Sequence, residues 1–459
     1  METLQRMANR GSISTGPYEI DNSVKLEPDN SEYFQRAASG SDGSLTTWTF
    51  SLWLKRTELS HACIFYSQGG TGRVRFESDD TFSFMYKSGH ELTTSRRFRD
   101  TSAWYHIVIA VDTTQGTASN RIKIYINGVQ ETMSGTQPDE DEASDFGEFG
   151  SVTAQLGQFS EGSYYFAGYM AEFYWIDGTA EAPTAFGEFD EDTGIWKPKK
   201  YTGSFGSEGA YLDFADSGNL GDDESGNGND YAEQNIAAAD QATDTPTNNF
   251  CVLSTLWTYA HGNTISEGST KIYGAANDWG GGKASFGLTA GKWYWEIEQL
   301  AAGNTFMGLQ TDGDSNIGSG NAQSHNISVV FYTDGTLQYS GGSETTTSAS
   351  NSIGANSIVG FALDLDSGTQ TIKIYLDGSL ITTFGSSGTC NLSTYNIEDT
   401  TVFPFVALYD RTVNMNFGGY TVTSISSAQA DANGYGTFEH APPTGYYAVC
   451  TKNLSEFGG

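Results

Sequence analysis

The sequence predicts an all-β protein made of two antiparallel β-sandwich (jelly-roll) domains in tandem, and three observations support this prediction. The chain of 459 residues contains 55 glycines against 9 prolines, and 13% of its residues are aromatic. Short apolar runs recur along both halves and are separated by turn residues, which is typical of sandwiches and barrels. One motif, an apolar run followed by Ile-Lys-Ile-Tyr and a glycine turn, occurs once in each half.

The duplicated motif predicts the same pair of strands in each half. Residues 107–128 read IVIAVDTTQGTASNRIKIYING, and residues 358–378 read IVGFALDLDSGTQTIKIYLDG. Asn-Gly and Asp-Gly tolerate the positive φ values of the tight turns that join right-twisted antiparallel strands. Since side chains alternate along a strand, three apolar side chains of each copy share one face: Ile122, Ile124 and Ile126 in the first, and Ile372, Ile374 and Leu376 in the second.

The length of the chain is that of two or three domains, and we divide it into three segments. Residues 1–20 show no clear period and are interpreted as an N-terminal arm that docks on a partner. Residues 21–245 form the first sandwich, and residues 246–459 form the second sandwich with a C-terminal tail. The boundary is placed at the breaker Thr-Pro-Thr-Asn-Asn of residues 245–249.

Strands are expected where short apolar or alternating runs lie between turn residues. In the first half these runs are 47–54, 62–66, 73–76, 81–86, 104–111, 122–126 and 164–176, the last as a central strand. In the second half they are 292–299, 305–309, 327–332, 337–339, 358–365, 371–376, 402–408 and 413–417. Residues Ser427–Asp431 are the one candidate for a short helix.

The charge of the chain excludes some classes of partner. The formal net charge is −33 and the isoelectric point is about 4.3. Since both halves are acidic, neither is suited to a phosphate backbone, and we expect no nucleic-acid binding. No run approaches the roughly 20 apolar residues of a membrane helix, so membrane insertion is not expected. The start, METLQRMANRGSIS, lacks the apolar core of a secretory signal.

Both halves resemble known sandwich families. In the first half TFSLWLKR, AWYHIVIAVD, KIYINGV and FAGYMAEFYWIDG resemble laminin G-like, concanavalin-type lectin domains over about residues 21–235. The loop within Tyr211–Asp230 resembles a loop that comes before the opening strand in those domains. In this chain the loop comes after the body of the domain, so we expect it to supply a closing strand. In the second half GKWYWEIE, VVFYTDG, VGFALDLDSGTQTIKIYLDG and VFPFVALYDRTVNMNFG resemble a SPRY domain.

The tandem of a lectin-like and a SPRY-like sandwich resembles bacteriophage tail fibre or spike proteins, as does the tail Pro442–Leu454. This resemblance implies a non-enzymatic virion appendage protein, extracellular after release, that binds a host-surface glycan or protein. It further implies that the N-terminal arm docks on other virion structural proteins and that the protein is a homo-oligomer, with a trimer favoured. The alternatives are a structural or capsid-decorating virion protein, a glycan hydrolase, and a cellular surface lectin.

Candidate ligand-binding residues are aromatic side chains next to turns. Tyr164 and Tyr165 follow Gly162, and Trp279 precedes Gly280. Aromatic faces stack on the apolar side of sugar rings, while a few polar groups fix the hydroxyls. The alternative for each of these three residues is that its ring packs in a sandwich.

Calcium is the candidate metal, because hard oxygen ligands on flexible loops suit it. Residues 221–230 (GDDESGNGND) supply such oxygens from Asp222, Asp223, Asn227, Asn229 and Asp230. The order does not match an EF-hand, and the alternative is that this acidic loop is simply solvated. The six histidines show no ligand spacing for zinc.

The hydrolase alternative depends on a pair of carboxylates. Retaining glycosidases need two carboxyl groups about 5 to 5.5 Å apart, and Glu296 and Glu298 share one face of a predicted strand. The alternative is a solvated strand face with Trp295 and Ile297 inside. No Gly-x-Ser-x-Gly elbow or phosphate loop occurs, so no catalytic residue is predicted.

The four cysteines are far apart in the sequence and include no Cys-x-x-Cys pair. We expect reduced thiols in the cores, with a Cys251–Cys450 bridge as the alternative.

Overall fold

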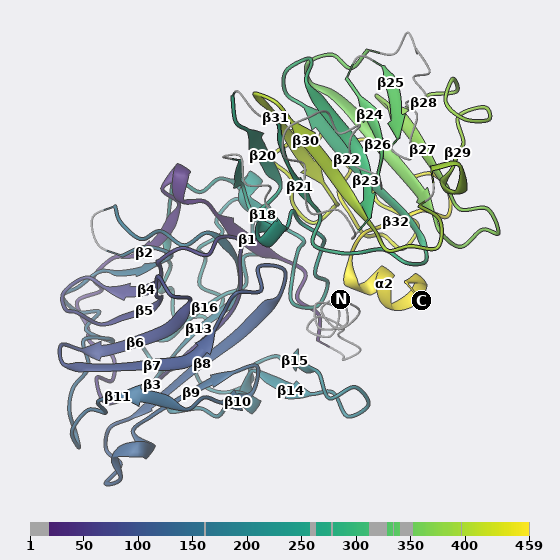
Figure 1. Ribbon diagram of the computed structural model, residues 1–459. Coiled ribbons are helices and arrows are strands. Elements are labelled where there is room, and N and C mark those ends of the chain that lie inside the picture. The colour runs from purple at the N-terminus through teal and green to yellow at the C-terminus, as the bar shows by residue number, and fades with distance from the viewer. Residues whose placement is uncertain are drawn as a thin grey trace. The chain divides into compact units, whose positions relative to one another are not determined.

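The computed structural model describes residues 18–159, 162–257, 263–276, 279–311, 328–333, 335–339, 352–395 and 397–458. The chain divides into two compact units, and we call Arg10–Thr247 the first unit and Asn248–Gly459 the second unit. Each is built from sheets whose strands pair antiparallel, except for the parallel pairing of β22 with β32, and most of the strands are labelled in Figure 1. The predicted fold class, all-β with sandwich domains, is confirmed.

The described residues of the first unit form two large sheets, which we name after a central strand of each. The β3 sheet has the order β10-β9-β8-β3-β13-β1-β18, and β16 also pairs with β13. The β6 sheet has the order β11-β7-β6-β5-β4-β12-β2-β17, and β14 and β15 form a separate hairpin. The strands are β1 Ser23–Leu26, β2 Tyr33–Arg36, β3 Thr47–Arg56, β4 Ala62–Ser67, β5 Arg73–Phe76, β6 Thr81–Lys87, β7 His90–Arg97, β8 Trp104–Asp112, β9 Ile122–Ile126, β10 Val129–Gln130, β11 Met133–Gly135, β12 Ala154–Leu156, β13 Gly168–Asp177, β14 Gly187–Phe189, β15 Trp196–Pro198, β16 Ala210–Leu212, β17 Ala232–Gln234 and β18 Gln241–Ala242.

The described residues of the second unit also form two sheets. The β22 sheet has the order β19-β20-β31-β22-β26-β27-β28, with β29 on β27 and β32 on β22, and the β23 sheet has the order β21-β30-β23-β24-β25. The strands are β19 Thr264–Ser266, β20 Lys271–Gly274, β21 Gly280–Lys283, β22 Lys292–Gln299, β23 Thr305–Thr311, β24 Ser328–Tyr332, β25 Thr336–Tyr339, β26 Ser357–Asp364, β27 Thr371–Leu376, β28 Ser379–Leu380, β29 Cys390–Asn391, β30 Val402–Leu408, β31 Arg411–Asn416 and β32 Tyr447–Ala448.

Helices are short. Thr451–Phe457 forms the α-helix α2 (Figure 1). Single 3-10 turns are formed by Pro28–Asn30, Ala118–Asn120, Pro183–Ala185, Ala238–Asp240, Thr255–Trp257 and Leu392–Tyr395. The short helix considered at Ser427–Asp431 is absent; instead, Gln429 pairs with Phe438 in a β-bridge. Across the described part of the chain, no helix has the length and hydropathy of a membrane span.

A hydrophobic core lies between the two sheets of each unit. In the first unit Phe50 of β3 contacts Phe65 of β4, and Trp48 stacks on Trp175 with ring centroids 4.6 Å apart. In the second unit Trp295 of β22 stacks on Phe361 of β26 at 5.3 Å. The four cysteines are buried and carry free thiols, so the alternative Cys251–Cys450 bridge is not formed.

The duplicated motif forms the expected structure in both units. Ile122, Ile124 and Ile126 are buried in β9, as are Ile372 and Ile374 in β27, while Leu376 is half-buried. Asn127 and Gly128 have φ values of 48° and 76°, and Asp377 and Gly378 have 47° and 76°. These positive values are those of the tight turns that the sequence predicts.

The outer face of one sheet in each unit is covered by a later segment of the chain. In the first unit Phe186 and Tyr201 pack on Tyr174 and Ile176 of β13. In the second unit Phe438 and Tyr446 pack with Tyr294 of β22. Side chains on these outer faces are therefore buried although they point away from the main cores.

Candidate functional site

Tyr164 is an exposed aromatic residue on the outer side of the β6 sheet. Its side chain is 46% exposed and its φ is 53°, a left-handed conformation that is uncommon for tyrosine. The amide N–H of Cys63 in β4 donates to the Tyr164 carbonyl oxygen at 2.8 Å, which holds Tyr164 beside this strand. The ring lies 4.3 Å from the His61 ring, centroid to centroid. Tyr164 therefore presents one aromatic surface to solvent next to a histidine.

Tyr165 is packed more closely. Its hydroxyl accepts a hydrogen bond from Gln158 Nε2 at 3.0 Å, and its ring centroid is 6.1 Å from that of Tyr33. The side chain is half-buried. The two neighbouring tyrosines thus differ, and Tyr164 is the one whose ring is open to a ligand.

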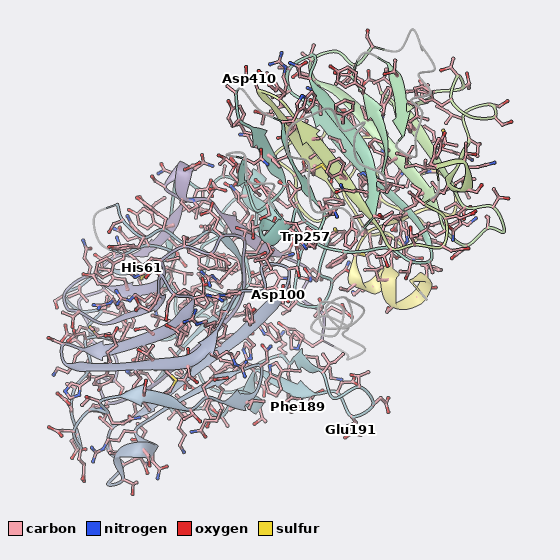
Figure 2. All side chains as sticks on the ribbon, in the orientation of Figure 1. His61, Asp100, Phe189, Glu191, Trp257 and Asp410 are labelled. Atoms are coloured by element: carbon pink, nitrogen blue, oxygen red, sulfur yellow. The ribbon has the colours of Figure 1, made fainter. Side chains whose placement is uncertain are left out.

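A chain of polar side chains runs from His61 across the β6 sheet, and we call it the outer row: His61, Glu77, Arg75, Glu91, Ser83 and Arg73. His61 Nε2 lies 3.5 Å from Glu77 Oε2, and Arg75 Nε lies 2.5 Å from Glu77 Oε1. Arg75 Nη2 lies 3.4 Å from Glu91 Oε1, which also accepts from Ser83 Oγ at 2.6 Å. Figure 2 labels His61, where the row begins.

Strand alternation explains why these side chains face outward. Val74 and Phe76 of β5 are buried in the core, so Arg73 and Arg75 point to the opposite face. Ser83 lies between the core residues Phe82 and Phe84, and Glu91 precedes the core residue Leu92. The outer row is therefore a consequence of the same alternation that builds the core.

The electrostatics of the row are balanced. Arg75 pairs with Glu77 and Glu91, and Arg73 Nη2 lies 3.9 Å from Glu91 Oε1. Burial lowers the pKa of His61, and the adjacent Arg75 and Arg73 lower it further, against the opposing effect of Glu77. The imidazole is consequently neutral at pH 7, so two arginines and two glutamates compensate each other.

Sequence reasoning missed the outer row, although part of its signal is visible. The alternation in Arg-Val-Arg-Phe (residues 73–76) marks two arginines on a face opposite apolar residues. His61 and Glu77 lie outside the strands, and the sequence gives no sign that they meet.

Trp279 is located in the second unit and packs against its own sheet. Its ring centroid is 4.9 Å from Phe306 and 5.9 Å from Tyr409. The side chain is half-buried against Phe306, Phe405 and Ala407. These contacts are those expected if the Trp279 ring packs in the sandwich. Sugar binding by Trp279 stays a prediction.

The residues of the predicted calcium loop are held by hydrogen bonds to the chain itself. The Asp223 carboxylate accepts from the backbone N–H groups of Tyr211, Ser225 and Asn229, each at 2.8 to 2.9 Å. Asp230 accepts from the Asp223 N–H at 3.1 Å, and the Asp222 N–H donates to the Asn219 carbonyl.

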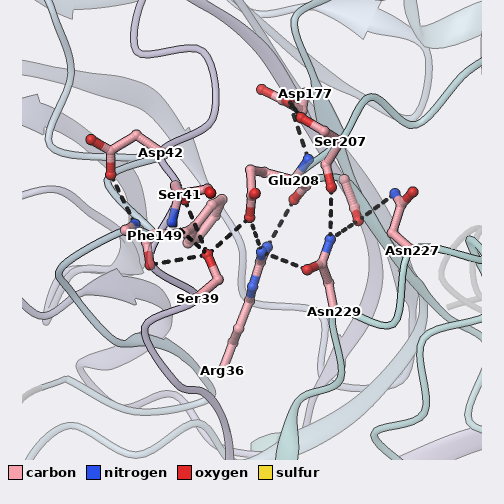
Figure 3. A network of polar contacts seen from close by, with 12 residues as sticks. Arg36, Ser39, Ser41, Asp42, Phe149, Asp177, Ser207, Glu208, Asn227 and Asn229 are labelled. Atoms are coloured by element: carbon pink, nitrogen blue, oxygen red, sulfur yellow. Dashed lines mark hydrogen bonds and ion pairs between the residues drawn. The ribbon is translucent and has the colours of Figure 1, made fainter.

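Arg36 of β2 is at the centre of this network (Figure 3). Its guanidinium donates to the Glu208 carbonyl at 2.8 Å and to Asn229 Oδ1 at 2.8 Å, and it pairs with the Glu208 carboxylate at 2.5 Å. Asn227 and Asn229 in turn donate to the Gly209 carbonyl at 3.0 and 2.8 Å. A guanidinium thus provides positive charge beside the loop. Within the described residues, no three His, Cys, Asp or Glu side chains converge as metal ligands; calcium binding stays a prediction.

The carboxylate pair of β22 has a different environment from the one predicted. Glu296 is 2% exposed, so the interpretation of its strand face as solvated is wrong. Its carboxylate accepts from the backbone N–H groups of Glu439 and His440 at 2.9 and 2.8 Å and from the Tyr294 hydroxyl at 3.0 Å. The covering segment described above is the physical reason, and burial raises the Glu296 pKa.

Glu298 is half-buried and also engaged. Its carboxylate accepts from Asn414 Nδ2 at 2.7 Å and from Thr423 Oγ1 at 2.8 Å. Both glutamates therefore fasten later parts of the chain to β22.

Ser51 and His106 lie at the spacing of a nucleophile and its base, but with the reverse polarity. Ser51 Oγ is 2.9 Å from His106 Nε2, while Trp196 Nε1 donates to His106 Nδ1 at 3.0 Å. Because Nδ1 accepts a bond, the neutral ring carries its proton on Nε2 and donates it to Ser51. A general base would have to accept from serine instead.

Comparisons with known proteins agree with a lectin-like first unit. The model of the concanavalin A-like lectin/glucanases superfamily (Laminin_G_3) matches residues 28–183. No curated protein matches the chain.

Three similar solved structures illustrate the structural comparison. The SPRY domain of human HERC1 is 17% identical, with 36% of this chain and 96% of that chain covered, at a TM-score of 0.28. A candidate carbohydrate binding protein from Bacteroides ovatus is 19% identical, with 37% and 46% covered, at 0.28. A heptameric SAP-like pentraxin from Limulus polyphemus is 14% identical, with 36% and 80% covered, at 0.27. Identities and scores this low carry no information about function.

The lectin-like sandwich of residues 28–183 indicates a binding role.

Proposed function

We propose that this protein is a non-enzymatic subunit of a virion appendage, of the tail fibre or spike type, whose first unit binds a host-surface glycan. The observation that carries the glycan-binding part is the exposed Tyr164 ring beside the outer row. It combines an apolar ring face with hydrogen-bonding groups, which is how proteins bind sugars. The superfamily of the match to residues 28–183 includes lectins, which supports this assignment.

The virion part of the proposal rests on the resemblance of the tandem to bacteriophage appendage proteins. In this role the N-terminal arm docks on other virion structural proteins, and the favoured trimer presents several copies of the glycan site. Linked copies raise avidity by about 10² to 10⁴ without new contacts. A weak site on each subunit is then sufficient for attachment.

The absence of enzymatic activity is part of the same proposal. Glu296 and Glu298 are the best candidates for a catalytic carboxylate pair. Their carboxylates accept hydrogen bonds from backbone and side-chain donors of the same chain. Catalysis by such a pair would require an open cleft with both carboxylates facing the glycosidic bond.

Two measurements test the proposal. The full-length protein on a glycan array is expected to bind a limited set of host-surface glycans without degrading them. Imaging of intact particles at side-chain detail is expected to find the chain in an appendage. An empty array combined with tight binding to a purified particle component would instead support the structural or capsid-decorating alternative, and glycan breakdown would support the hydrolase.

A further inference from the structure

We infer that the surface formed by Tyr164 and the outer row selects a neutral, hydroxyl-rich sugar over an acidic one. This inference rests on the proposed glycan-binding function and adds the chemical class of the ligand. It follows from the charge balance of the row, from its hydrogen-bonding groups, and from the position of the aromatic ring.

Charge balance is the first step. Arg73 and Arg75 are each within 4 Å of Glu91, and Arg75 is also paired with Glu77. The row therefore has no net positive charge to offer a carboxylate or sulfate. The whole chain carries −33, so the surrounding potential repels anions rather than attracting them.

The second step is the hydrogen-bonding capacity of the row. Carboxylates only accept and guanidinium groups only donate, whereas a sugar hydroxyl does both. Neighbouring hydroxyls of one sugar can therefore bridge Arg75 and either Glu77 or Glu91, whose side chains keep 23% and 35% of their surface exposed. An acidic sugar would place its own carboxylate against these glutamates.

The third step is the aromatic surface. Tyr164 is held by the hydrogen bond from the Cys63 N–H to its carbonyl oxygen and by its contact with the His61 ring. The Tyr164 ring lies 4.3 Å from the His61 ring, centroid to centroid, and His61 Nε2 lies 3.5 Å from Glu77 Oε2, so the ring is next to the end of the row. A pyranose that stacks on Tyr164 can thus direct hydroxyls toward Glu77 and Arg75.

The test uses the full-length protein on immobilised neutral oligosaccharides and on matched oligosaccharides that contain uronic acid or sulfate. The unaltered protein is expected to bind only among the neutral set. Tyr164→Ala is expected to weaken that binding about tenfold or more. Phe189→Ala, which removes a 49% exposed ring from the β14–β15 hairpin of the same unit (Figure 2), is expected to change it less than about twofold.

Charge variants test the selectivity itself. The double variant Glu77→Gln/Glu91→Gln leaves Arg73 and Arg75 unpaired, and we expect it to gain at least about tenfold for the acidic set relative to the neutral set. The matched variant Arg73→Gln/Arg75→Gln is expected to gain nothing for the acidic set. Thermal unfolding of each variant checks that its fold is retained.

The outcomes separate the inference from the proposed function. Preference of the unaltered protein for acidic glycans, or neutral binding that survives Tyr164→Ala, would overturn the inference and leave glycan binding intact. Failure of the Glu77→Gln/Glu91→Gln variant, while folded, to gain acidic ligands would also overturn it. No binding to any glycan would overturn the proposed function.

Discussion

His106 shows how a buried ionisable side chain is kept neutral. It lies between Trp53, whose ring centroid is 4.5 Å away, and Trp196, and both of its ring nitrogens are engaged in hydrogen bonds. The side chain is 1% exposed, and burial lowers its pKa to about 3. Its protonation would bury a charge with no acceptor for the second N–H, because Nδ1 already faces the Trp196 N–H.

We predict that His106 makes the first unit less stable as the pH falls. In the unfolded chain histidine takes up a proton below about pH 6.5, while in the folded protein His106 does so only near pH 3. Lowering the pH between these values therefore favours unfolding. The free energy of unfolding is not reduced by His106 above pH 6.5. Below pH 6.5, the uptake of a proton by the unfolded chain alone reduces it by about 1.4 kcal/mol per pH unit.

A comparison with His106→Gln isolates this effect, because buried carboxyl groups titrate in the same range in both proteins. The difference in free energy of unfolding between the two should be about 2 kcal/mol smaller at pH 5 than at pH 7. Denaturant unfolding at both pH values measures it. A difference that does not change with pH would contradict the assignment of His106 as a buried neutral residue.

Arg36 is the second residue whose loss should be costly. Arg36→Ala leaves the buried Glu208 carboxylate without its cation and the Gly221–Asp230 loop without its central donor. We expect it to lower the free energy of unfolding by about 3 kcal/mol, the usual cost of breaking a buried ion pair. Arg97→Ala removes a half-exposed pair with Asp79 at 3.8 Å and should cost less than about 0.5 kcal/mol. Equal costs for the two variants would contradict a structural role of the Arg36 network.

At the scale of strands, the sequence is informative wherever alternation alone decides the structure. β5, β22, β27 and β30 begin and end at the residues predicted from their apolar or alternating runs. The predicted central strand 164–176 is central but begins only at Gly168. Tyr164 to Ala167 continue the aromatic pattern, yet Tyr164 turns through a left-handed conformation, and pattern alone cannot distinguish these two uses of aromatic residues.

The candidate site was only partly predictable for a related reason. Tyr164 was recognised because an aromatic residue near glycine is a local signal. His61, which contacts Tyr164, and Glu77, which contacts His61, are 103 and 87 residues away from Tyr164 in the sequence (164 − 61 and 164 − 77). The pairing of β4 with β5 brings His61 to Glu77, and the hydrogen bond from the Cys63 N–H brings Tyr164 to β4. The burial of Glu296 depends likewise on a covering segment that begins more than 130 residues later.

Glu296 of β22 accepts hydrogen bonds from the backbone of the C-terminal segment, and this interaction leads to a prediction at the scale of strands. The Glu439 and His440 N–H groups donate to different oxygens of the Glu296 carboxylate, so Glu296→Gln makes one of these two N–H groups face an amide NH2 group, which is itself a donor. We expect a loss of about 2 kcal/mol in the stability of the second unit, together with faster proteolysis near Glu439. The control is Glu298→Gln, whose two donors reach the same carboxylate oxygen, which an amide oxygen can replace. Unchanged stability of Glu296→Gln combined with lost glycan breakdown would point to catalysis instead.

At the scale of the whole molecule, the net charge of −33 determines how ionic strength acts on binding. Raising the salt concentration from roughly 0.01 M to 1 M shortens the Debye length from about 30 Å to about 3 Å. This change removes most of the long-range repulsion between an acidic protein and an acidic glycan. A neutral glycan experiences almost no such force, because its contacts are short-range stacking and hydrogen bonds.

We therefore predict that the dissociation constant for a neutral glycan changes less than about twofold over this salt range, as measured by calorimetry or interferometry on the full-length protein. An acidic glycan, where any binding is detectable, should bind better as salt increases, since screening weakens the repulsion. The Glu77→Gln/Glu91→Gln variant should show the opposite trend for acidic glycans, because its unpaired arginines attract them at short range and salt weakens that attraction. Binding of the unaltered protein that falls steeply with added salt would mean that an anion, and not a neutral sugar, is held against the arginines of the outer row.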